Sequence, residues 1–276
     1  MIKKYTRKTF IYTAVAAGAA LILIPMAAAV ASSFKTQNEI MHSFFSLPGK
    51  LNLSNYQQIL SRSDYYYALR NTVMITAVCL ILNYLLIPMA SYPIARRMKH
   101  EGFFKFLYIF MVSGIFVPFQ VRMLPLIKLM NEIDMANDLG LILVYVSSAV
   151  CEGVFLYCGY LVNIPTDMEE AASIDGASVV QTYVKIMLPL MKPMTATLII
   201  KNGLWYWNDY LLPSMMLKTA KTRTLTLFQY NFKTEYLTNY PLIFAAFVLS
   251  LIPIMIFYVV MQRRIMDGMT AGAVKG

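Results

Sequence analysis

Charged side chains are scarce in this chain. They make up 14% of its 276 residues, whereas 58% of the residues are hydrophobic. A soluble domain carries about 25% charged residues, so the excess apolar surface must be buried somewhere other than a protein core. The net charge of +10 does not indicate nucleic-acid binding, because the basic residues cluster beside apolar segments, as orientation in a membrane requires.

Cysteine and histidine are also rare. Cys79, Cys151 and Cys158 all lie in apolar segments and form no CxxC pair, and His42 and His100 are not at metal-ligand spacing. We therefore expect small buried cysteine side chains rather than disulfides, and neither a metal site nor a cofactor.

Sequence signatures of catalysis are missing as well. The Gly49-Lys50 pair is followed by Leu51, so the phosphate-binding loop of ATPases, in which serine or threonine follows the lysine, is absent. No HExxH or GxSxG sequence occurs. We expect no enzymatic activity in this chain.

The chain does contain long apolar segments. A helix needs about 20 residues to cross about 30 Å of hydrocarbon, and segments of about this length recur along the sequence. They lie at residues 10–31, 72–95, 103–125, 139–162, 186–213 and 242–262. The sequence therefore predicts an all-α integral membrane protein with about six transmembrane helices.

The first apolar segment resembles a signal peptide at its end, where small residues run from Ala27 to Ala31. A signal's apolar region has about 7–15 residues, and this one is longer. We interpret it as a retained membrane helix.

Basic residues set the predicted orientation. They gather before the first segment, between the second and third, and after the last, at Lys3, Lys4, Arg7, Lys8, Arg96, Arg97, Lys99, Arg263 and Arg264. By the positive-inside rule, both termini and residues 163–185 lie in the cytoplasm. In the outer loop, the turn-prone Pro48-Gly49 precedes a short helix that Ser54 is expected to cap.

The cytoplasmic stretch of residues 163–185 predicts a short, separately capped helix. Thr166 or Asp167 is placed to cap its start, Gly176 to end it in a left-handed conformation, and Ser178 to cap the next helix. Physical reasoning alone leaves two interpretations open, an amphipathic connector or a rigid docking knob.

The same stretch resembles the EAA signature of ABC importer permeases at every fixed position. The matching residues are Glu170, Ala171, Ala172, Gly176, Ile186, Leu188 and Pro189. In that family this segment is the coupling helix, which docks in a cleft of the ATPase subunit. The resemblance implies that these residues couple the chain to a separate ATPase.

Other segments are similar to carbohydrate permeases of the MalG-like type. They are the run from Trp205 to Pro213, which contains Asn208, and the tail Met269–Gly276. The resemblance implies a single transmembrane permease domain over residues 1–276 with the MetI-like fold. It also implies a bacterial or archaeal plasma membrane, a second homologous permease, two ATPase subunits and an extracytoplasmic sugar-binding protein as partners.

Polar residues within the apolar segments are candidates for the translocation path. Charges at the bilayer centre cost about 2.5–3.5 kcal/mol on insertion scales and usually face a cavity or a partner. Glu152 and Asp209 line the path or form structural pairs, and Lys201 is a candidate partner for Glu152. Asn208 lines the path or caps a broken helix before Pro213.

The aromatic residues Trp205, Tyr206, Trp207 and Tyr210 form an interfacial belt or stack on sugar.

The leading functional hypothesis is a permease subunit of an ATP-driven carbohydrate importer, with oligosaccharides as the expected solute class. Two alternatives remain. One is an ABC permease for a non-sugar solute such as a phosphorylated polyol. The other is a self-contained secondary transporter, which predicts an inverted repeat that the sequence does not display.

Overall fold

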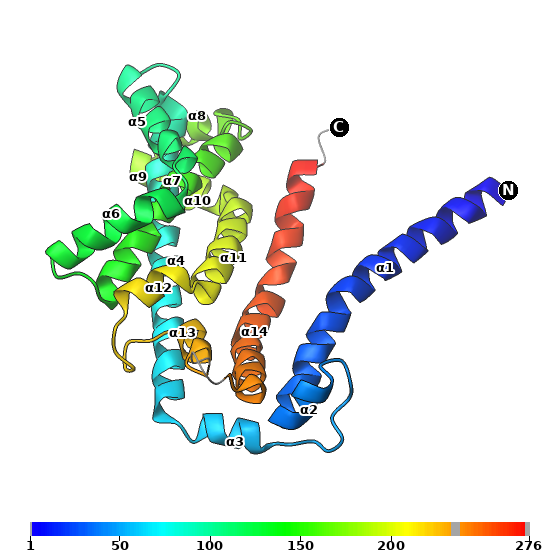
Figure 1. Cartoon of the computed structure of the whole chain (residues 1–276). Coiled ribbons are helices and arrows are strands. Elements are labelled where there is room, and N and C mark those ends of the chain that lie inside the picture. Colours follow the sequence, from blue (N-terminus) through cyan, green and yellow to red (C-terminus); the bar gives the residue numbers. More distant parts are fainter. Residues whose placement is uncertain (1, 233–237, 274–276) are drawn as a thin grey trace. The chain divides into compact units, whose positions relative to one another are not determined.

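The computed structural model describes the backbone of residues 2–232 and 238–273, and the side chains of residues 8, 10–232 and 238–262. The described residues form helices and contain no β-strand, as the sequence predicts (Figure 1). The tail resemblance at Met269–Gly276 concerns side chains outside the described residues. By their contacts, the residues fall into two compact units, Met1–Tyr66 with Leu227–Pro253 and Tyr67–Thr226 with Ile254–Gly276. The single-domain organisation stays a prediction.

The helices of the amino-terminal half are α1 (Ile2–Ser33), α2 (Gln37–His42), α3 (Ser54–Leu60), α4 (Ser63–Arg97), α5 (Gly102–Ser113), the 3-10 helix η1 (Gly114–Phe116), α6 (Phe119–Glu132) and α7 (Asp138–Leu161). Those of the carboxyl-terminal half are α8 (Asp167–Ile174), α9 (Val179–Thr182), the π-helix η2 (Tyr183–Met187), α10 (Leu188–Leu190), α11 (Lys192–Asn208), α12 (Leu211–Met216), α13 (Leu225–Tyr230) and α14 (Tyr240–Ala273).

The first unit is held together by polar contacts around the end of α1. The Lys35 side chain is fully buried, and its ammonium group donates to the Ser43 and Phe44 carbonyls at 3.0 Å. The amide of Asn55 on α3 donates to the carbonyls of Ser33 and Lys35. Helix α3 is therefore anchored in this unit.

The predicted cap of α3 is wrong. Ser54 is the first residue of α3, and the side chain of Asn52 accepts its amide at 3.0 Å. Asn52, two residues before the helix, thus accepts the amide at its start in place of Ser54, because Asn forms this local bond as readily as Ser.

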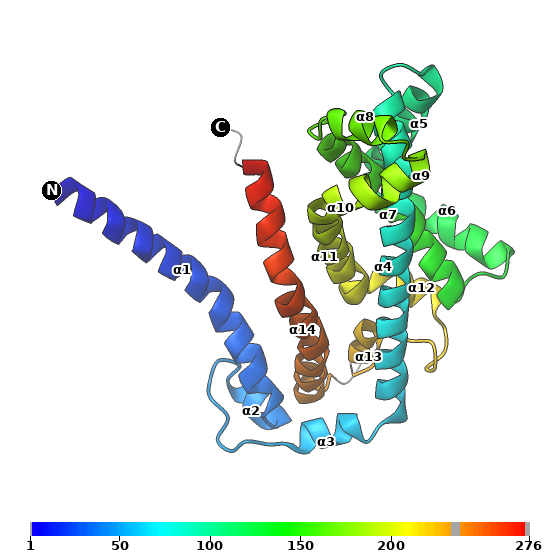
Figure 2. The same cartoon turned by 180° about the vertical axis from the view of Figure 1, so that it is seen from behind.

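The second unit has a core built from α4, α7 and α11, which lie side by side (Figures 1 and 2). Gly153 of α7 faces Ile87 of α4 so closely that an added Cβ would lie 2.6 Å from the isoleucine. Tyr157 of α7 shares a hydrogen bond of 2.6 Å with Thr195 of α11, and both side chains are buried. Cys79 and Cys158 are buried free cysteines, as predicted, and Cys151 is half-buried.

Four described helices are long and apolar enough to cross a membrane, and six spans result if each of two bent helix pairs forms one span. The four are Phe10–Ser33, Ser63–Arg97, Asp138–Leu161 and Tyr240–Gln262. They contain or closely match the predicted segments 10–31, 72–95, 139–162 and 242–262.

The third and fifth predicted segments are broken rather than continuous. Between Gly102–Phe116 and Phe119–Glu132 the chain bends by 101°, and between Val179–Leu190 and Lys192–Asn208 by 67°. The first break is at Pro118, which lacks an amide hydrogen and keeps the residue before it extended. Hydropathy reports apolar content and not helix direction, so the sequence predicts the apolar segments 103–125 and 186–213 but not these bends within them.

Candidate functional site

Helix α8 is a short helix with its own start and stop. Its first turn holds Asp167, Glu169 and Glu170, which suit the positive end of the helix dipole. Gly176 has a φ of +81°, and the Ala177 amide donates to the Ala172 carbonyl at 2.9 Å. This backbone bond and the left-handed glycine form a Schellman ending, as the sequence predicts for Gly176.

The predicted side-chain cap at the start of α8 is not formed among the described residues. Thr166 occupies the cap position, but its backbone carbonyl, not its hydroxyl, accepts the Glu169 and Glu170 amides at 2.8 and 3.0 Å. The predicted cap of the next helix is confirmed. Ser178 and Gln181 form a reciprocal capping box at the start of α9.

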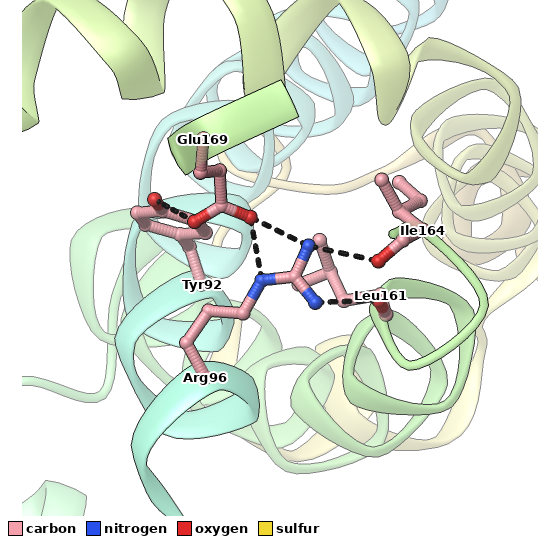
Figure 3. A network of polar contacts seen from close by, with 5 residues as sticks. All are labelled: Tyr92, Arg96, Leu161, Ile164 and Glu169. Atoms are coloured by element: carbon pink, nitrogen blue, oxygen red, sulfur yellow. Dashed lines mark hydrogen bonds and ion pairs between the residues drawn. The ribbon is translucent and has the colours of Figure 1, made fainter. Parts of the chain in front are cut away.

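A polar network ties α8 to the end of α4 (Figure 3). Arg96 Nε donates to Glu169 Oε1 at 2.7 Å, and its Nη2 lies 2.6 Å from the same oxygen. The Tyr92 hydroxyl donates to Glu169 Oε2 at 2.6 Å. Arg96 also donates to the carbonyls of Leu161 and Ile164 at 3.0 and 3.1 Å. We call Tyr92, Arg96 and Glu169 the Arg96 joint.

No local pattern in the sequence singles out the Arg96 joint. By themselves, Arg96 indicates an orienting charge and Glu169 a partner of the helix dipole, and 73 residues separate the two in the chain. The sequence signal for this contact is an arginine at the end of one span together with a glutamate in the first turn of a cytoplasmic helix.

The predicted coupling residues differ in exposure. Glu170, Ala171 and Gly176 are exposed, whereas Ala172 is 7% exposed and packs inward. The surface around them also presents large apolar side chains, with Ile174 87% and Val179 73% exposed. The knob therefore offers acidic and apolar groups together.

The remaining three matching residues lie at a widened helical turn. Ile186 is part of η2, where the Leu188 amide donates to the Tyr183 carbonyl five residues back. Pro189 has no amide hydrogen, and in an ordinary helix its ring would clash with the Lys185 carbonyl. The wider π-turn makes room for it, and such turns frequently occur at functional sites.

A second candidate site is a cavity of about 480 Å³ beside the bend between α5 and α6. Glu152 and Lys201 line it and form an ion pair with each other, which is one of the two interpretations that the sequence leaves open for Glu152. Trp205 and Arg122 also line it, and the Arg122 guanidinium lies 5.6 Å from the Phe119 ring centre. The cavity joins charged donors and acceptors to aromatic rings, a combination that suits polyhydroxylated solutes.

Asn208 and Asp209 are not among the residues that line this cavity. The Asn208 amide donates to the Leu204 carbonyl of its own helix. Asp209 accepts the Tyr145 hydroxyl at 2.7 Å and the Leu211 amide at 3.0 Å, at the start of α12. The helix is broken here as predicted, but Asp209 rather than Asn208 supplies the stabilising acceptor.

Two of the four aromatic residues of this segment are buried in the protein. Tyr206 is 3% and Trp207 7% exposed, and the Tyr206 hydroxyl accepts a hydrogen bond from the Asn83 amide at 2.7 Å. An interfacial belt is therefore the wrong interpretation for these two rings. Trp205, by contrast, reaches the cavity.

Known proteins resemble the chain across most of its length. The family described as "Binding-protein-dependent transport system inner membrane component" matches residues 87–270. The chain is 42% identical, over 96% of each chain, to the multiple sugar-binding transport system permease protein MsmG of Streptococcus mutans serotype c. It is 34% identical, over 92% of each chain, to the probable starch degradation products transport system permease protein AmyC of Thermoanaerobacterium thermosulfurigenes.

The fold also resembles a solved structure. A chain of a bacterial ABC transporter that imports the acidic polysaccharide alginate superposes with a TM-score of 0.78. The match covers 93% of this chain and 96% of that one, at 22% identity. At this identity the similarity concerns the fold.

Proposed function

This chain belongs to the family of binding-protein-dependent transport system inner membrane components, and we propose that it is the permease subunit of an ATP-driven carbohydrate importer, with oligosaccharides as the solute class. It is a multi-pass membrane protein with no catalytic role of its own. ATP hydrolysis belongs to separate subunits. Relatives named for the transport of several sugars and of starch degradation products support the solute class.

The observation that carries the proposal is the construction of α8. Of its eight described residues, Ala172 is buried and Glu169 is held in the Arg96 joint, so the other six are exposed to a partner. Exposed Ile174 and Val179 provide apolar contact area, and Glu170 provides charge. We assign this surface to an ATPase subunit, with Glu170, Ala171, Ala172, Gly176, Ile186, Leu188 and Pro189 forming or positioning it.

The remaining partners and the orientation follow from the same proposal. A second, homologous permease completes the translocation path, and an extracytoplasmic sugar-binding protein delivers the solute. A related structure contains an alginate ABC transporter in complex with a periplasmic protein that holds an alginate pentasaccharide. Both termini and α8 lie in the cytoplasm. ATPase closure then reaches the membrane helices through α8 and drives alternating access.

We assign the translocation path to the cavity that Glu152 and Lys201 line. Their ion pair places a carboxylate and an ammonium group beside Trp205. Sugar hydroxyls both donate and accept hydrogen bonds, and aromatic rings pack against sugar rings. Asn208 and Asp209 border the path where α11 gives way to α12, at the break that Asp209 stabilises.

Substitution of one exposed apolar residue tests the docking surface. Ile174→Glu should reduce co-purification of the ATPase with the tagged chain by about tenfold, because it places a charge in an apolar contact. Leu47→Glu is the matched control, since Leu47 is 83% exposed but lies in the outer segment between α2 and α3. Equal ATPase recovery from both variants would refute docking at α8.

A further inference from the structure

The Arg96 joint fastens α8, whose only buried residue is Ala172, to the ends of α4 and α7. Helix α8 contributes Glu169, and the last turn of α4 contributes Arg96, with Tyr92 one turn before it. The carbonyls that Arg96 also binds belong to Leu161, the last residue of α7, and to Ile164 just beyond it. One guanidinium group therefore holds three segments (Figure 3).

The geometry of this contact is that of a rigid fastening. The side chains of Arg96 and Glu169 are each 17% exposed. Both carboxylate oxygens accept hydrogen bonds, and all three guanidinium nitrogens donate. Charge-assisted bonds of this kind are roughly twice as strong as neutral ones and fix orientation.

Apolar packing cannot replace this fastening. Ala172, the single buried residue of the fully described α8, contributes only a methyl group to packing. The segments on either side of α8 are short non-helical connectors, and the second contains the left-handed Gly176. Without the joint, α8 could shift on these connectors while α4 and α7 stayed in place.

The Tyr92 ring extends the connection to a fourth segment. Its centre lies 5.6 Å from that of Tyr183, the first residue of the π-helix η2. The start of α8, the end of α7, the end of α4 and the turn leading into α11 thus meet around two side chains of α4.

We propose that Arg96 and Glu169 are positioning residues that make α8 move as one body with the cytoplasmic ends of α4 and α7, so that ATPase movement is converted into rearrangement of the membrane helices. This inference rests on the proposed function. It adds that the coupling depends on a joint behind the docking surface as well as on the surface itself.

Substitutions separate the joint from docking. Arg96→Ala and Glu169→Gln leave the exposed surface of α8 unchanged, so the ATPase should still co-purify. Arg96→Lys keeps the charge, but one ammonium group cannot satisfy the carboxylate and both carbonyls at once. Tyr92→Phe removes a single hydrogen bond and serves as the mild variant if Arg96→Ala does not fold.

The control is the neighbouring arginine. Arg97 is 58% exposed and lies 3.7 Å from Glu101, a surface pair of the i,i+4 type. Arg97→Ala removes the same charge from the same turn of α4 and should have little effect.

The first measurement is import of tritiated raffinose and maltotriose per ATP hydrolysed, in proteoliposomes that contain the transporter purified with its partner subunits. We expect sugar transported per ATP to fall about tenfold in Arg96→Ala, with smaller losses in Arg96→Lys and Tyr92→Phe. Arg96→Ala combined with Glu169→Gln should be no worse than Arg96→Ala alone, because both remove the same joint. An unchanged ratio in Arg96→Ala would overturn the inference.

The second measurement does not depend on transport. Hydrogen–deuterium exchange of α8 in the detergent-solubilised chain should be faster in Arg96→Ala than in Arg97→Ala, because α8 is no longer fastened. Equal exchange would overturn the inference even if import falls. Absence of import by the wild-type transporter would instead refute the proposed function, and the exchange result would still decide whether the joint fastens α8.

Discussion

Neutralising Glu152 tests how an ion pair inside a membrane helix bundle is stabilised. In the isolated chain the side chains of Lys201 and Glu152 are 48% and 38% exposed at the cavity that both line. Two charges about 4 Å apart interact by about 4 kcal/mol at an effective dielectric constant of 20. Exposed pairs retain about 0.2–1 kcal/mol of this after solvation, whereas an unpaired charge at the bilayer centre costs about 2.5–3.5 kcal/mol.

Partial exposure places this pair between the two limits. We expect Glu152→Gln and Lys201→Met each to lower the free energy of unfolding by about 1–2 kcal/mol, since each leaves the other charge without its partner. The double variant should recover most of the loss, which gives a coupling energy of about 2 kcal/mol. Chemical denaturation in detergent micelles, followed by tryptophan fluorescence, measures these values.

A second ion pair of the chain calibrates the cycle. Lys128 and Glu132 lie 3.8 Å apart with side chains 80% and 61% exposed. The same pair of substitutions there should give a coupling energy of less than about 0.5 kcal/mol. If the two cycles give equal values, the reasoning about the membrane environment of Glu152 is wrong.

Three further substitutions have definite expectations. Gly176→Val should cost about 1–2 kcal/mol at a φ of +81° and weaken ATPase recovery without affecting membrane insertion, as fractionation and co-purification will show. Gly153→Ala should lower the melting temperature in detergent because its Cβ would meet Ile87 at 2.6 Å, whereas Gly159→Ala, with no neighbour within 4 Å, should not. Asp209→Asn should lower the free energy of unfolding by about 1 kcal/mol in the denaturation assay and leave sugar uptake largely intact. Complete loss of uptake in a variant that folds would contradict the structural role of Asp209.

The spans could be predicted because they depend on composition. A run of about 20 apolar residues is a local property of the sequence, and the helix-ending Gly176 is equally local. The bend at Pro118 was not predicted, because hydropathy is averaged along the sequence and does not depend on the direction of the helix. A proline within an apolar segment marks a point where the helix can break, but it does not determine the angle of the bend.

Contacts between distant segments were predicted only where chemistry left few partners. Glu152 needed a cation within the apolar segments, which contain few charges, and Lys201 was one of the few candidates. Arg96 had no such restriction, since a cation at the end of a span is satisfied by water or lipid headgroups as well as by Glu169. The register of α8 against α4 is set by tertiary packing, which the sequence does not express in any local pattern.

Reconstituted import tests the permease role most directly. The tagged chain, purified from its native membrane with its partner subunits, is placed in proteoliposomes with ATP and assayed for uptake of tritiated raffinose, maltotriose and glycerol 3-phosphate. We predict ATP-dependent uptake of an oligosaccharide by the complete complex, and neither uptake nor ATP hydrolysis by the chain alone. ATP hydrolysis by the chain alone, or uptake of the phosphorylated polyol but of neither sugar, would contradict a carbohydrate permease that depends on a separate ATPase.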